Sequence, residues 1–263
     1  MDLPGIKEVM AAPSATWRPG DAWLGGGTWL FSRPQPDIDR LLDLHHFGWP
    51  PCERVADGIS IAATCTIGEL LELPEVREWS ALSLMRHCCE AFSGSFKIRN
   101  LATVGGNLAL SLPIGPMISL FSGLDGVCVI ESAARSRAVP ASEFVTGIGT
   151  NVLEPDELVR SVLLPTSVLR DRVAFRRISL TRHGPSAVVV VGRSAPGGCT
   201  LTVTAATPCP RQLTFPDVPS AHEAIARLEH GAWSYVGDFH GSDLWRRHMT
   251  RKLVVDVLEE LSG

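Results

Sequence analysis

The sequence has no strong excess of one charge, no long apolar run and no paired-cysteine motif. Twenty-four Lys and Arg stand against 28 Asp and Glu, and this net charge of −4 gives no attraction for nucleic-acid phosphates or anionic lipid. No stretch approaches the ~18 apolar residues of a membrane span, and residues 1–20 contain no apolar signal-peptide region. We therefore expect a cytoplasmic protein without a nucleic-acid partner or a membrane span.

The cysteine pattern excludes a disulfide framework and the common metal sites. The chain has seven cysteines, an odd number, and none of them forms a CxxC pair. We expect reduced, structural thiols, with neither a zinc site nor an iron–sulfur cluster in this chain. The HExxH and GxSxG motifs are also absent, and the adjacent His45 and His46 lie where an apolar segment passes into a loop, which does not favour a metal site. We therefore predict no catalytic and no metal-ligating residue.

The hydrophobic pattern changes character near residue 155. The preceding part mixes strand-like and helical segments, including a capping box formed by Thr66 and Glu69. The following part has four strand-like runs, at residues 159–164, 173–178, 187–192 and 201–205. Two predicted helices come after them, at residues 221–228 and 243–261, and Ser242 is the expected N-cap of the second. At roughly 150 residues per domain, 263 residues fit an α+β fold of two lobes, 1–155 and 156–263.

Basic residues gather on the last predicted helix, at positions 246, 247, 251 and 252. They form either a solvated surface or a contact with a partner subunit.

Glycine is the unusual residue of this chain, because several of its 24 glycines are bunched. The first glycine loop, residues 24–30, reads LGGGTWL, and the second, residues 103–107, reads TVGGN. Glycine lacks a Cβ, so the amides of such loops can approach a phosphate closely, and neighbouring Thr or Asn adds a side-chain donor. Two facing loops of this kind would enclose a pyrophosphate, although either loop alone is also explained as a tight turn. Neither loop has the Rossmann or the Walker spacing.

The order of these motifs resembles the flavin subunit of the molybdenum hydroxylases, the medium chain of carbon monoxide dehydrogenase and xanthine dehydrogenase-like enzymes. GGGT is followed about 75 residues later by IRNLATVGGN, at residues 98–107. Further matches are Ile61-Ala62-Ala63 with Thr66, the GIGT and PDELV stretches at 147–159, and Asp238 with the segment 241–248. Order and spacing agree over nearly the whole chain.

The resemblance implies a two-lobed, non-Rossmann FAD-binding fold of the vanillyl-alcohol oxidase and para-cresol methylhydroxylase type. The first lobe would consist of two α/β subdomains, and the second of a C-terminal α+β flavoprotein domain. FAD would be held non-covalently by the positions that match the family's motifs: Leu24, Gly25, Gly26, Gly27, Thr28, Trp29, Ala102, Thr103, Gly105, Gly106, Asn107, Leu158, Val159 and Arg176.

The resemblance also assigns roles to these positions. The two glycine loops would hold the pyrophosphate from opposite sides, and Leu158 and Val159 would pack on the adenine end or on the ring edge. Arg176 would lie near N1 and O2 of the flavin, where a cation stabilises the anionic reduced form; otherwise it is a solvated strand residue. The sequence departs from the family pattern at Trp29 and Pro116, where the family has Asp.

The function implied is that of an FAD-containing electron-transfer subunit in a multisubunit molybdenum hydroxylase. A large partner subunit would hold molybdopterin and a small one [2Fe–2S] clusters, and electrons would leave FAD to NAD, a quinone or oxygen. Two alternatives stay open. One is a self-contained flavin reductase, because residues 24–30 also resemble a loop of UDP-N-acetylenolpyruvoylglucosamine reductase. The other is a flavin-free assembly subunit, which the departures at Trp29 and Pro116 suggest.

Overall fold

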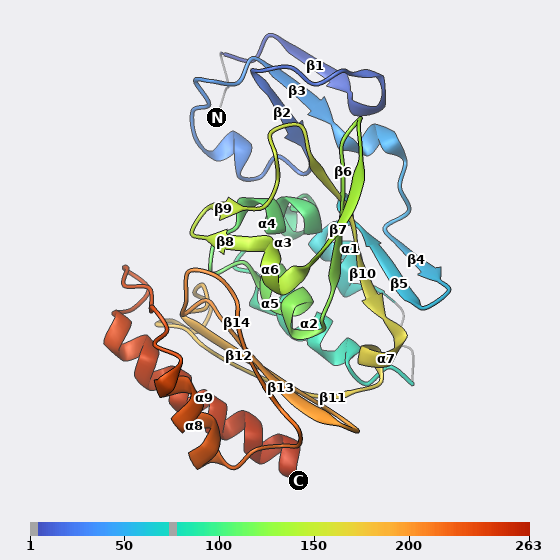
Figure 1. Cartoon of the computed structure of the whole chain (residues 1–263). Coiled ribbons are helices and arrows are strands. Elements are labelled where there is room, and N and C mark those ends of the chain that lie inside the picture. The colour runs from blue at the N-terminus through green and yellow to red at the C-terminus, as the bar shows by residue number, and fades with distance from the viewer. Residues whose placement is uncertain (1–4, 74–77) are drawn as a thin grey trace.

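A computed structural model of the chain describes residues 5–73 and 78–263. Three units follow one another along the long axis of the molecule (Figure 1). A small three-stranded sheet carries the N-terminus, a five-stranded sheet with several helices lies in the middle, and a four-stranded sheet covered by two helices carries the C-terminus. This is the expected α+β architecture.

The N-terminal unit is a parallel sheet of order β1-β3-β2. Its strands are β1 (Glu8–Ala11), β2 (Asp21–Leu24) and β3 (Arg40–Asp43), and its 3-10 turns are η1 (Ala12–Ser14), η2 (Leu30–Ser32) and η3 (Leu44–Phe47). Two hydrogen bonds of 2.7 and 2.6 Å join the guanidinium of Arg40 to the buried carboxylate of Asp21. This charged pair connects β2 to β3 directly before the first glycine loop.

The middle unit is an antiparallel sheet of order β4-β5-β10-β6-β7. Its strands are β4 (Cys52–Val55), β5 (Gly58–Ala62), β6 (Val127–Glu131), β7 (Ser136–Pro140) and β10 (Leu158–Pro165). The central strand β10 is the first of the four runs that the sequence places in the C-terminal lobe. That assignment is wrong, because β10 pairs with β5 and β6, and the chain reaches the C-terminal sheet only after Pro165.

Seven helices and a small hairpin complete the described part of the middle unit. They are α1 (Ile67–Leu71), α2 (Leu82–Ala91), α3 (Phe96–Arg99), α4 (Val104–Leu110), α5 (Pro116–Gly123), α6 (Ala141–Phe144), α7 (Thr166–Leu169), and the hairpin of β8 (Val145–Gly147) and β9 (Thr150–Asn151). The capping box is confirmed, since the Glu69 amide donates to Thr66 Oγ1 and the Thr66 amide donates to Glu69. Helix α5 is buried along its whole length.

The C-terminal unit is an antiparallel sheet of β11 (Arg172–Ile178), β12 (Val188–Ala195), β13 (Gly198–Thr204) and β14 (Arg211–Phe215). Helices α8 (Ala221–His230) and α9 (Asp243–Ser262) cover its outer face, and α2 and α5 contact its inner face (Figure 1). Ser242 caps α9 as expected, because its Oγ accepts from the Trp245 amide at 3.2 Å.

The basic residues of α9 do not form one surface. The side chain of Arg246 is fully buried, donates to the Ala205 carbonyl at 2.6 Å and pairs with Asp238. Arg251 pairs with Glu229 on α8, whereas Arg247 and Lys252 are exposed. Arg246 is therefore a structural cation that holds the start of α9 against the end of β13.

Five of the seven cysteines are buried, and all seven are free thiols. Burial raises the pKa of Cys89 and of Cys128 to about 12, and that of Cys199 to about 11. These thiols therefore stay protonated at neutral pH.

A buried carboxylate, Glu157, holds the segment that leads into β10. Its side chain is 1% exposed and accepts from Arg137 at 2.6 Å and from Arg135 at 3.0 Å. The hydrogen bond from Arg137 is the main reason why the pKa of Glu157 falls from 4.5 to about 2. The charged form is thus the one that the folded chain stabilises.

We expect Glu157→Gln to lower the free energy of unfolding at pH 7 by about 3 kcal/mol, because two arginines lose a buried anionic partner. A lowered pKa contributes stability above the unfolded value, and this stability is lost as the pH falls from 4.5 towards about 2. Unfolding of both proteins, measured across this range, should therefore show a shallower acid dependence for the variant. Glu154→Gln, at an exposed neighbour, is the control. Equal acid dependence in Glu157→Gln and the wild-type chain would contradict this account.

Candidate functional site

The first glycine loop follows β2 and lies directly against the backbone of the second loop. A Cβ on Gly26 would lie 1.5 Å from the Leu101 carbonyl oxygen, and one on Gly25 would lie 2.8 Å from Thr103 Oγ1. Gly27 has a φ of +67°, where a side chain is strained in any case. Glycine is therefore required here because the two loops touch.

The amides of the first glycine loop are free. Within the described chain, none of the N–H groups of residues 26–30 donates to a protein acceptor, whereas the Phe31 amide donates to the Gly27 carbonyl at 2.9 Å. A run of adjacent N–H groups without partners is costly unless water or a ligand accepts from them, and such a run forms a site for an anion.

The amides of the second glycine loop, unlike those of the first, already have hydrogen-bond partners. The Val104 amide donates to the Cys65 carbonyl and the Gly105 amide to the Ala63 carbonyl, each at 2.8 Å. The Gly106 amide donates to Thr103 Oγ1 at 3.1 Å. This loop is thus fixed to the segment that joins β5 to α1. It offers a hydroxyl and side chains rather than the free amides that the sequence suggests.

A cavity of about 500 Å³ lies between the two loops. It brings together nine of the predicted residues: Leu24, Gly25, Gly26, Gly27, Thr28, Trp29, Thr103, Gly106 and Asn107. Seven further residues complete its wall: Trp23, Leu30, Ser32, Phe92, Ile98, Ala109 and Leu110. Sequence reasoning did not select these residues, which are mostly apolar; only Leu30 and Ile98 among them lie within the sequence motifs.

The wall of this cavity is uncharged but contains an unused donor. None of its lining residues is Asp, Glu, Lys, Arg or His. The indole nitrogen of Trp23 is buried and has no hydrogen-bond partner within the described chain. Neutral donors with few internal partners suit a ligand that supplies its own negative charge.

Five predicted residues do not line this cavity. Ala102 and Gly105 are buried behind it, where Gly105 allows α4 to approach Ala63, since a Cβ there would lie 2.5 Å from that of Ala63. Leu158 packs in the core of the N-terminal unit, and Val159 in the core of the middle unit. Both are core residues of β10 and do not contact the loops' cavity.

Arg176, the fifth such residue, points away from both glycine loops. Its Nη1 lies 2.5 Å from Glu260 Oε2 on α9, at the outer face of the C-terminal sheet. Because successive side chains of a strand alternate, its neighbour Arg177 faces inward, where it donates to the Gly184 carbonyl at 2.7 Å. Of these two adjacent arginines, Arg176 thus lies on the outer face of the sheet and Arg177 on the inner face.

Arg177 lines a second cavity, of about 410 Å³, between the middle and C-terminal units. Arg99, Arg182 and His183 also line it, and Glu90 is the one acidic residue among its lining side chains. Burial lowers the pKa of Arg177. Phe92 belongs to the walls of both cavities, so the basic cavity adjoins the uncharged one.

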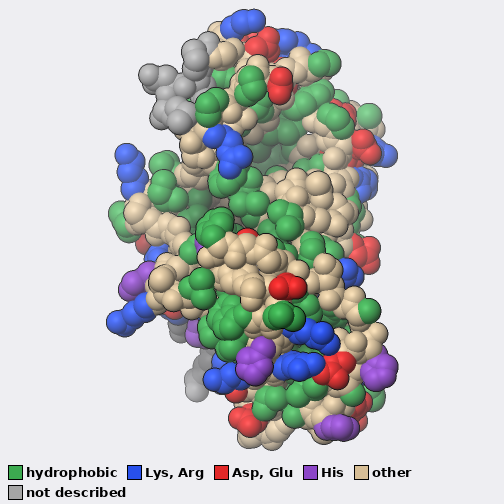
Figure 2. Space-filling view, turned by 90° about the vertical axis from the view of Figure 1, so that its left-hand side faces the viewer, with side chains coloured by type: hydrophobic (Ala, Val, Ile, Leu, Met, Phe, Trp, Pro, Cys, Tyr) green, Lys and Arg blue, Asp and Glu red, His purple; other side chains and the backbone are tan. Residues whose placement is uncertain are grey.

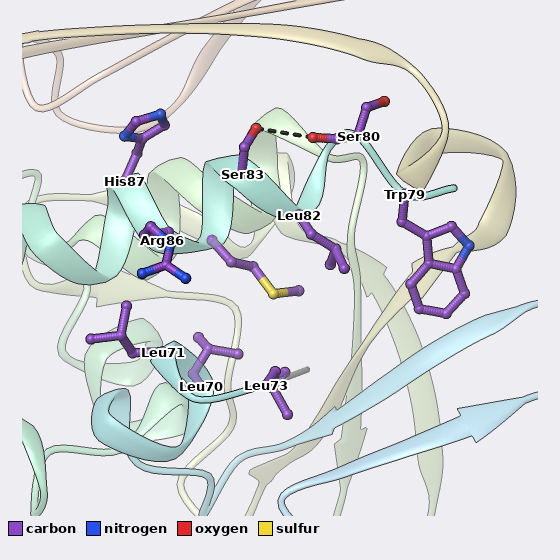
Figure 3. A pocket seen from close by; sticks show the side chains of 10 residues that line it. Leu70, Leu71, Leu73, Trp79, Ser80, Leu82, Ser83, Arg86 and His87 are labelled. Atoms are coloured by element: carbon purple, nitrogen blue, oxygen red, sulfur yellow. Dashed lines mark hydrogen bonds between the residues drawn. The ribbon is translucent and has the colours of Figure 1, made fainter. Parts of the chain in front are cut away.

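A third cavity, of about 400 Å³, lies between α1 and α2 (Figure 3). Leu70 and Leu71 approach it from α1, and Leu82 and Arg86 from α2, with Trp79 at one end. It contains none of the predicted residues. His87 at its edge stacks on Phe175 of the C-terminal sheet, with ring centroids 5.4 Å apart.

The left-hand face of Figure 1 is turned towards the viewer in Figure 2. Its upper half is hollowed, and hydrophobic side chains gather there. No cluster of three or more His, Cys, Asp or Glu side chains suited to a metal ion occurs among residues 5–73 and 78–263. In the same residues, no helix has both the length and the apolar character needed to cross a membrane.

Structural comparison confirms the fold. Quinoline 2-oxidoreductase from Pseudomonas putida 86 superposes with a TM-score of 0.81 at 19% identity, over 99% of this chain and 98% of that one. Carbon monoxide dehydrogenase from Oligotropha carboxidovorans gives a TM-score of 0.81 at 17% identity, over 98% of both chains. The expected two-lobed FAD-binding fold is therefore correct.

Sequence comparison gives relatives and a family. The nicotinate dehydrogenase FAD-subunit of Eubacterium barkeri is 31% identical over 66% of this chain and 55% of its own length. The glyceraldehyde dehydrogenase medium chain of Sulfolobus acidocaldarius is 29% identical over 49% of this chain and 43% of its own length. The chain thus spans about half the length of these curated relatives. Residues 6–167 match the family described as the FAD binding domain in molybdopterin dehydrogenase. This match covers more than half of the chain, which therefore belongs to that family of FAD-binding domains.

Proposed function

We propose that this chain is the FAD-carrying electron-transfer subunit of a multisubunit molybdenum-dependent dehydrogenase or hydroxylase. The observation that carries the proposal is the run of free amides at residues 26–30, which faces an uncharged cavity of about 500 Å³ in a chain of an FAD-binding family. When bound, FAD accepts electrons from one partner and passes them to another.

The first glycine loop would hold the pyrophosphate of FAD. Its free amides would donate to the phosphate oxygens, and Thr28 and Thr103 lie in the same cavity wall with their hydroxyls. Asn107 Oδ1 accepts from the Met117 amide at 3.1 Å, which leaves Nδ2 as the remaining donor of that side chain. These uncharged donors would hold the negatively charged phosphates without a cation in the cavity wall.

The basic cavity would hold the redox-active ring. It adjoins the uncharged cavity at Phe92, so one elongated ligand can extend through both. A reduced flavin carries negative charge at its pyrimidine side, and a cation close to it stabilises that state. Arg177, on the inner face of β11, takes the role that the family resemblance gives to Arg176.

The partners follow from the names of the relatives, which are an FAD-subunit and a medium chain. A large subunit would hold molybdopterin and oxidise the substrate, and a small subunit would carry [2Fe–2S] clusters that deliver electrons to FAD. The final acceptor would be NAD, a quinone or oxygen.

The proposal is tested by purifying the chain from its own cells under native conditions. We expect about one FAD per chain, released on denaturation, together with a larger molybdenum-containing chain and a smaller iron–sulfur chain. A flavin-free spectrum would instead favour an assembly subunit. A lone flavin-bound chain that reduces an enolpyruvyl sugar nucleotide with NADPH would favour the self-contained reductase.

Gly106→Val tests the position of the pyrophosphate. A Cβ on Gly106 meets only Thr103 Oγ1, at 2.9 Å, and otherwise extends into the cavity. We expect FAD affinity to fall at least tenfold, while the unfolding temperature changes by only a few degrees. Gly237→Val, where an added Cβ makes ordinary contacts, is the matched control. Full FAD retention in Gly106→Val would mean that the phosphates lie elsewhere.

Arg177→Gln tests the position of the ring. We expect the midpoint potential of the bound flavin to become more negative, by on the order of 30 mV, which is about 1.4 kcal/mol for a two-electron couple. Arg176→Gln is the control, because its partner is Glu260 on the outer face. Spectroelectrochemical titration of both variants decides the question, and a larger change in Arg176→Gln would refute the assignment.

A further inference from the structure

Trp29 is a partly exposed aromatic residue of the cavity wall with an arginine over its ring. The guanidinium of Arg33 lies 4.2 Å from the ring centroid, and 40% of the Trp29 surface is exposed. The residue belongs to the lining of the uncharged cavity. It is not a member of any of the three hydrophobic cores of the described chain.

The backbone of Trp29 is held in place. Its carbonyl accepts from the Ser32 amide at 2.9 Å and from the Ser32 hydroxyl at 2.6 Å. The ring therefore projects from a fixed point directly beside the free amides of residues 26–30. A flat ligand group that is joined to a phosphate lies within reach of such a ring.

We propose that Trp29 stacks on the adenine of FAD and thereby makes this chain prefer the dinucleotide to FMN. The inference rests on the proposed function, in which FAD is the ligand. Aromatic side chains stack on bases through their π faces, and Arg33 on the far side of the indole completes a layered arrangement.

Adenine fits this position better than the flavin ring does. The pyrophosphate occupies the middle of the ligand, at the free amides, and the basic cavity with Arg177 lies beyond Phe92. The flavin suits that basic end, since its charge becomes negative on reduction. Trp29 belongs to the N-terminal unit, whereas Phe92 belongs to the middle unit, so the indole meets the remaining end of the ligand.

The charge around Trp29 agrees with this assignment. The guanidinium of Arg33, stacked on the indole, adds a positive charge beside the free amides. The family resemblance places Asp at this position, so Trp29 gives this chain an aromatic surface where the family pattern has a carboxylate.

The experiment compares Trp29→Ala and Trp29→Phe with the wild-type chain, all freed of flavin, by measuring dissociation constants for FAD, ADP and FMN. We expect Trp29→Ala to bind FAD and ADP about tenfold more weakly with FMN affinity unchanged, because only the adenine contact is lost. Trp29→Phe should recover most of the affinity, and bound FAD should quench less tryptophan fluorescence in it than in the wild type.

Trp79→Ala is the matched control. Trp79 also carries a stacked arginine, with Arg54 lying 5.0 Å from its ring centroid, but it lines the third cavity (Figure 3). We expect its FAD and ADP affinities to equal those of the wild type. Circular dichroism and unfolding temperatures show that each variant is folded.

Three results would overturn the inference. If Trp29→Ala binds FAD as tightly as the wild type, the stacking contact does not exist, while the proposed function stands. If FMN binding weakens as much as FAD binding, Trp29 contacts the flavin half instead. If the wild-type chain binds neither FAD nor ADP, the proposed function falls together with this inference.

Discussion

The close contact of two glycine loops is the constraint on which the rest of the site depends. Gly26 faces the Leu101 carbonyl at a distance that leaves no room for a Cβ, and Gly25 faces the Thr103 hydroxyl in the same way. This contact joins the N-terminal unit to the middle unit. The amides of Val104 and Gly105 in the second loop donate to the segment between β5 and α1, whereas the amides of residues 26–30 in the first loop have no partner within the described chain. The cavity thus lies between a wall with satisfied amides and a loop with free donors.

Local signals in the sequence were sufficient for local structure. The capping box of Thr66 and Glu69 and the Ser242 cap each depend on residues a few positions apart, and both are confirmed. The second glycine stretch, which the sequence predicts as a loop, instead forms the N-cap and the first turn of α4. The prediction that residues 159–164, now seen in β10, belong to the C-terminal sheet is wrong because it depends on contacts with distant strands. A buried central strand and a strand of a C-terminal sheet are both apolar runs of similar length, and only pairing with β5 and β6 distinguishes them.

The same limit applies within the candidate site. Adjacent residues on a strand point to opposite faces, so Arg176 meets Glu260 on the outer face whereas Arg177 lines the basic cavity. Phe92 carries no motif at all, and it joins the cavity only because the end of α2 lies beside α3 and the second loop. Which side chains line a cavity is decided by contacts between segments that are far apart in the sequence. The hydrophobic periodicity of a single segment carries no information about those contacts.

The departures at Trp29 and Pro116 have a common electrostatic consequence. Pro116 is the buried first residue of α5, where a fixed φ and a missing N–H suit a helix start. With proline and tryptophan where the resemblance expects Asp, neither position carries a carboxylate. The uncharged cavity then offers only neutral donors, and the basic cavity offers three arginines against Glu90. In the proposed function, such a gradient would give the phosphates neutral donors and would surround the redox-active ring with positive charge, which favours its reduced form.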